Sequence, residues 1–93
     1  MDIHIRIKTK EGPIFWYHQG EEGSENFLAE GDTLIAQDPY GDEYLRGTSF
    51  SSWSAAKEAA KDAKTLVRWN NFDIKNVTFW TLENGEEVPV KPE

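Results

Sequence analysis

One stretch of this chain has helical spacing, and it limits the fold because the segments around it alternate like strands. Residues 51 to 69 read SSWSAAKEAAKDAKTLVRW, and their apolar side chains recur about every 3.6 residues. Ser51 or Ser52 can cap the N-terminus of this helix, and Asn70 or Asn71 can end it. The inward stripe consists of Trp53, Ala56, Ala60, Ala63 and Val67. A stripe rich in alanine predicts a helix that lies close over one face of a sheet.

Three hairpins are predicted around this helix. Ile3, Ile5 and Ile7 alternate with polar residues, and a second strand follows the sequence KEGP. The turn DPYGD predicts another hairpin before the helix, and Asn84-Gly85 predicts the last one after it. The sequence therefore predicts a single α+β domain over residues 1 to 93, in the order ββ-ββ-α-ββ. Its sheet is mainly antiparallel, with five or six strands and one helix on one face.

The register of the first hairpin depends on its loop, and two alternatives stay open. A two-residue loop places Trp16 on the isoleucine face, whereas a three-residue loop places Phe15 and Tyr17 there and leaves Trp16 beside Arg6. In the last hairpin, Trp80 and Leu82 lie on the face opposite its valines. The sheet surface away from the helix is therefore expected to carry Trp80 and Leu82, joined by Trp16 if the loop has three residues.

Charge is distributed unevenly along the chain. The net charge is −7, and residues 11 to 45 hold nine acidic residues but no lysine or arginine. A field of this sign repels phosphate, so direct binding to nucleic acid is not expected, whereas a protein with a basic surface is. Residues 20 to 32 are rich in glycine and acid and are expected to form a mobile loop, with at most one helical turn at Ser24.

Composition also bears on compartment and chemistry. The chain has no cysteine, which fits a reducing compartment, and we expect a cytoplasmic protein. Its N-terminus lacks the apolar core of a signal peptide, and no stretch is long and apolar enough for a membrane contact to be expected. His4 and His18 face each other in the three-residue register, yet they lack a third ligand. We therefore expect no metal, no cofactor and no catalytic residue.

The candidate interaction surface has an aromatic part and an acidic part. It comprises Trp16, Trp80 and Leu82 on the sheet, with Glu21, Glu22, Glu25 and Glu30 in or beside the loop. An exposed aromatic patch with a charged rim is typical of partner-binding surfaces. The alternative is that the 20 to 32 loop or a curl of the sheet covers these rings and makes a second small core.

These features predict a small acidic module that binds another protein and has no enzymatic activity. Two other functions stay open. One is an inhibitor that mimics nucleic acid and occupies a nuclease or a DNA- or RNA-binding protein, and the other is a ligand binder or enzyme with a pocket under the 20 to 32 loop. The exposed sheet face would also allow the chain to form a homo-oligomer.

Overall fold

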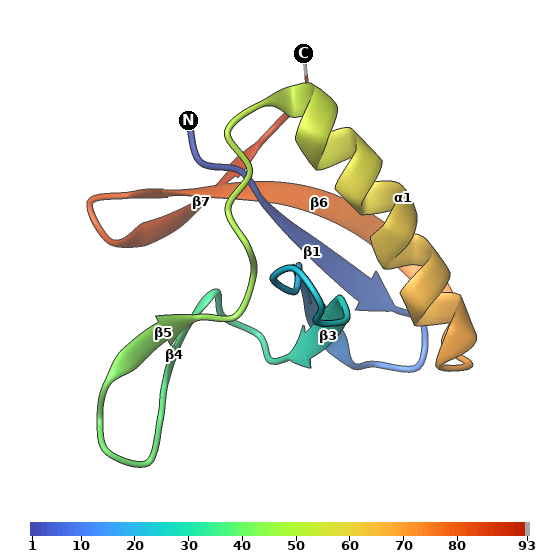
Figure 1. The fold of residues 1–93 in the computed structure, drawn as a ribbon, viewed down its shortest axis with the longest axis horizontal. Helices are drawn as coiled ribbons and strands as arrows, with labels where there is room; N and C mark the ends of the chain where they lie inside the picture. Colours follow the sequence, from blue (N-terminus) through green and yellow to red (C-terminus); the bar gives the residue numbers. More distant parts are fainter. Residues whose placement is uncertain (93) are drawn as a thin grey trace.

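The computed structural model describes residues 1 to 92, which fold into two sheets and one helix (Figure 1). The strands and the helix follow in the order β1 (His4–Thr9), β2 (Ile14–His18), β3 (Phe27–Glu30), β4 (Ile35–Gln37), β5 (Glu43–Leu45), α1 (Trp53–Trp69), β6 (Ile74–Glu83) and β7 (Glu86–Val90). The larger sheet has the strand order β3-β2-β1-β6-β7, and all of its neighbours are antiparallel. The predicted α+β class and its antiparallel sheet are confirmed.

The first hairpin has the three-residue loop. Arg6 pairs with Trp16 and Ile7 pairs with Phe15, so Phe15 and Tyr17 share a face with the isoleucines. Helix α1 crosses this face, which we call the helix face, and encloses an apolar core against it (Figure 1). Trp16 lies on the opposite face beside Arg6, as that register requires.

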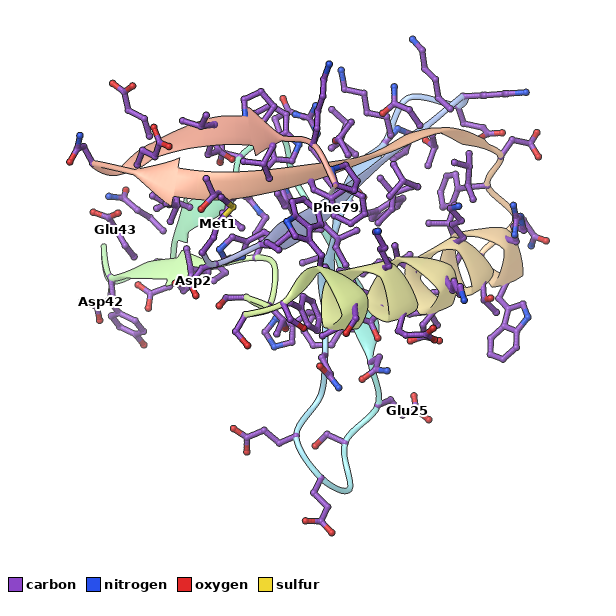
Figure 2. All side chains as sticks on the ribbon, turned by 90° about the horizontal axis from the view of Figure 1, so that it is seen from above. Met1, Asp2, Glu25, Asp42, Glu43 and Phe79 are labelled. Carbon is purple, nitrogen blue, oxygen red and sulfur yellow. The ribbon has the colours of Figure 1, made fainter. Side chains whose placement is uncertain are left out.

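Helix α1 forms as its sequence predicts. The Ser52 hydroxyl accepts a hydrogen bond from the Ala55 N–H, and the chain turns away after Trp69 with Asn71 at a φ of 64°. Its inner side is formed by Ala56, Ala59, Ala60, Ala63 and Val67, all buried. Phe79 of β6 lies between the sheet and this helix (Figure 2). The small alanines are what allow the close approach of α1 to β1 and β2.

The other two hairpins also follow their turn residues. β6 and β7 are joined by Asn84 and Gly85, which both have positive φ, as a tight two-residue turn requires. β4 and β5 form a separate two-stranded sheet that projects from the body of the molecule (Figure 1). In its turn Gly41 has a φ of 87° and its N–H donates to the Asp38 carbonyl.

Strand β3 was not predicted, because residues 20 to 32 were expected to be a loop. Phe27 and Leu28 instead open a short strand that pairs with β2, Phe27 opposite His18 and Leu28 opposite Tyr17. Ser24 lies in a turn and caps no helix. The strand escapes sequence analysis because Phe27 and Leu28 point to opposite faces, so the segment has no alternation of apolar and polar residues.

The face of the sheet opposite α1 is also covered. Residues 31 to 47, here called the strap, run from the end of β3 across this face and include the projecting β4–β5 hairpin. Leu34 of the strap is completely buried, and Ala36 is nearly so. The chain then continues past β1, where Phe50 pairs with Ile3 through two main-chain hydrogen bonds of 2.8 Å. The sheet is therefore the middle layer of three.

Candidate interaction surface

Trp16 is not on the surface. Its exposed fraction is 0%, and its indole N–H donates to the Gly31 carbonyl at 3.1 Å. A Cβ added at Gly47 would lie 3.4 Å from both the Trp16 ring and the Leu34 side chain, which places Leu34 and Gly47 directly around the indole. The expectation that Trp16 contributes to an exposed patch is therefore corrected. The strap, which begins with the last two residues of the 20 to 32 segment, covers this ring and makes the second small core.

Trp80 and Leu82 lie on the same face as Trp16 and are half-buried. The Arg6 guanidinium lies 4.2 Å from the centre of the Trp80 ring, within the range of a cation–π contact, and 6.0 Å from that of Trp16. Burial lowers the pKa of Arg6, although the charges of Glu87 and Asp32 act in the opposite direction. The two rings and the cation form a packed cluster, so this face offers little apolar surface to a partner.

His4 and His18 both form hydrogen bonds with main-chain carbonyls of the strap. The Nδ1–H of His4 donates to the Gly47 carbonyl at 3.0 Å, and that of His18 donates to the Arg46 carbonyl at 3.3 Å. β1 and β2 are not paired with each other at this end. The Tyr17 carbonyl accepts the Thr48 N–H instead, and Ile3 pairs with Phe50. The two imidazoles therefore serve the strap and do not face each other. Among the described residues, no three His, Asp or Glu side chains come together as a metal site requires.

The acidic residues do not form one surface. Glu21, Glu22 and Glu25 are exposed on the loop between β2 and β3, whereas Glu30 is exposed at the far end of β3. Asp42 and Glu43 lie on the β4–β5 hairpin, away from Glu25 (Figure 2). Six of the nine acids that are close in sequence are therefore divided between two projections, and the other three lie on neither.

A groove runs between β3 and the C-terminal half of α1, and we call it the β3–α1 groove. It consists of two hollows of about 440 and 330 Å³, whose linings are consecutive in sequence at residues 26 and 27 and at residues 69 and 70. The first is lined by Ser24, Glu25, Asn26, Asp62, Leu66 and Trp69, and the second by Phe15, Phe27, Leu28, Glu30, Asn70 and Phe72. The lining combines aromatic rings with three carboxylates and contains no lysine or arginine. It therefore suits an apolar segment that carries positive charge.

Asp62 of α1 connects the groove to the sheet. One of its carboxylate oxygens accepts hydrogen bonds from the Tyr17 hydroxyl at 2.6 Å and from the Asn26 side-chain amide at 2.9 Å. Asn26 in turn accepts the Gly20 N–H at 2.9 Å, so these bonds fix both ends of the acidic loop. Burial, together with the Asp62 carboxylate, raises the pKa of Tyr17. The trio is a structural support for the groove, since the shared oxygen already has two donors.

Two exposed aromatic residues that lie at the groove were missed by sequence analysis. The exposed fraction of Trp69 is 77%, and that of Phe27 is 50% although its ring stacks on His18. Sequence analysis gave Trp69 no role beyond the last position of the helical stretch, and it assigned Phe27 to a mobile loop. The available signal was the position of Trp69 outside the alanine stripe, at the last residue of the helix.

Comparison with family models, with curated proteins and with solved structures finds no significant match to this chain. In the part of the chain that the structure describes, α1 is too short and too polar to cross a bilayer. The geometry of the exposed surfaces is thus the basis on which a function is proposed.

Proposed function

We propose that this chain is a non-catalytic module that binds another protein through the β3–α1 groove. The observation that carries the proposal is the pair of exposed rings at the groove, Trp69 and Phe27, with Glu25 and Glu30 beside them. Exposed aromatic side chains within a charged rim are characteristic of binding surfaces. The partner is expected to present basic and apolar side chains.

The division of the acids favours this function over mimicry of nucleic acid. A mimic needs carboxylates in a continuous row, and here the loop and the β4–β5 hairpin carry separate groups (Figure 2). Asp38 also has a structural role, because its carboxylate accepts the N–H groups of Tyr40 and Asp42 in the turn. A small-ligand site is also less favoured. The groove is open to solvent, and its Asp62 carboxylate already accepts hydrogen bonds from Tyr17 and Asn26.

Affinity capture from the native lysate tests the proposal when it compares matched aromatic variants. Phe27→Ser and Trp69→Ser each remove an exposed ring from the groove, and Tyr40→Ser removes a ring that is 92% exposed on the β4–β5 hairpin. We expect the parent and Tyr40→Ser to retain the same protein partner and both groove variants to lose it, with circular dichroism confirming that each variant folds. Retention by both groove variants would contradict the proposed site.

A further inference from the structure

The two edges of the sheet differ in what they offer to another strand. In β7 the register places Glu87 and Pro89 opposite Leu82 and Trp80, at positions whose main-chain groups point away from β6. Pro89 has no N–H, so this edge cannot donate there, which is a common protection against unwanted pairing. Strand β3 reads FLAE and contains no proline, so each of its residues keeps its main-chain N–H.

At two residues of β3, the main-chain groups point away from β2 and have no hydrogen-bond partner among residues 1 to 92. Gly31 N–H donates to the Ile14 carbonyl at 2.9 Å, which fixes which pairs are hydrogen-bonded between β2 and β3. By the alternation of antiparallel ladders, Ala29 and Phe27 bond to β2, while Leu28 and Glu30 direct their N–H and C=O groups outward. The spacing of these two residues is that of a strand ready to accept another strand.

The β3–α1 groove next to this edge can receive the side chains of a strand added to β3. A strand added to β3 would point alternate side chains toward α1 and toward the strap. On the α1 side they would meet Leu28 and Phe72, and on the other side the exposed ring of Phe27. Glu25 and Glu30 lie at opposite ends of the strand and would attract positive charge at both ends of the guest.

We propose that β3 accepts an extended segment of a partner protein as a sixth strand, with an apolar centre and basic residues on both sides. The proposal rests on the function proposed above and specifies its mode of binding. A second copy of this chain fits less well, because antiparallel pairing of two β3 strands would bring Glu30 of one copy toward Glu25 of the other. The net charge of −7 adds to that repulsion.

A synthetic peptide can test the mode of binding directly. The probe has a central valine-threonine-valine stretch flanked by two lysines at each end, and its counterpart has glutamate in place of every lysine. We expect the lysine peptide to slow amide hydrogen exchange at Leu28 and Glu30 and the glutamate peptide to leave both unchanged. Protection elsewhere, or none at any concentration of the lysine peptide, would overturn the proposal.

Two variants at one position separate main-chain pairing from charge. Glu30→Pro removes an outward N–H without touching the bonds to β2, and we expect it to weaken binding of the lysine peptide about tenfold. Glu30→Gln keeps the N–H, and we expect a smaller loss together with a weaker dependence on salt. Equal binding by parent and Glu30→Pro would overturn strand addition.

Other outcomes discriminate between this inference and the function on which it rests. If the lysate partner depends on Phe27 and Trp69 but is bound equally by Glu30→Pro, strand addition is wrong while the interaction function stands. If protection of Leu28 and Glu30 rises with protein concentration in the absence of peptide, a second copy is the occupant, and a partner segment is not.

Discussion

The two faces of the sheet are both covered, but by different means. On the helix face, α1 packs an alanine stripe against isoleucines, which is burial of apolar surface by a regular element. On the other face, the irregular strap is held by specific polar contacts, including those of His4, His18 and Trp16. The difference teaches that surplus aromatic residues in a small domain can belong to a second core. The part of the sheet that remains accessible is its β3 edge, which lies between the layer formed by α1 and the layer formed by the strap.

The largest effect is expected for Trp16→Ala, which removes the centre of the strap face. A fully buried tryptophan typically contributes about 3–5 kcal/mol relative to alanine. Trp69→Ala is the control, and we expect it to change the free energy of unfolding by less than about 0.5 kcal/mol because the ring is exposed. Urea denaturation measures both. A small loss for Trp16→Ala would mean that the strap does not make a core.

Ala60→Leu tests the helix face. Three additional carbon atoms have no room between α1 and the sheet, and we expect a loss of about 1–3 kcal/mol from overpacking. Ala55→Leu adds the same atoms at an exposed position of the same helix and is expected to be close to neutral. An unchanged unfolding midpoint for Ala60→Leu would contradict the close approach of α1.

Gly31→Ala tests the start of the strap with a smaller change. Gly31 has a φ of 154°, and a Cβ there would overlap the Arg46 guanidinium, which donates to the Thr33 carbonyl at 2.6 Å. We expect a loss of about 1 kcal/mol, because the side chain is strained and displaces Arg46. The double variant Gly31→Ala with Arg46→Ala should lose less than the two single variants added together. Simple additivity would show that the overlap is absent.

Tyr17→Phe is expected to have the smallest effect at neutral pH, about 1 kcal/mol for the hydrogen bond to Asp62. The pKa of Tyr17 is raised in the folded state, whereas that of an unfolded tyrosine is about 10. As the pH rises past about 10, the unfolded chain loses this proton first, so the parent loses stability. Urea denaturation at about pH 8 and about pH 11 should show a smaller decline for Tyr17→Phe. Equal declines would mean that Tyr17 does not titrate differently on folding.

Local patterns predicted most of the fold. The alanine stripe and the turns at Gly41 and Gly85 placed α1 and two hairpins, since each depends on neighbours in sequence. The first hairpin was left with two registers, because its loop tolerates either length. Strand β3 was missed because its two apolar residues, Phe27 and Leu28, point to opposite faces and show no alternation with polar residues.

The candidate surface was harder to predict than the fold. Burial of Trp16 depends on Leu34 and Gly47, which lie beyond β3 and β5 in the chain and are far from Trp16 in sequence. The same strap engages His4 and His18. Exposure of Phe27 follows from the pairing of β3, which sequence spacing did not show.

Amide hydrogen exchange of the free protein tests most directly the claim that both faces are closed and the β3 edge is open. Within one strand, we predict slow exchange at Phe27 and Ala29, whose N–H groups point to β2, and fast exchange at Leu28 and Glu30. Gly31 should resemble the slow pair, because its N–H bonds to Ile14. Slow exchange at Leu28 and Glu30 in dilute, peptide-free protein would show that the edge is already covered and would contradict the account.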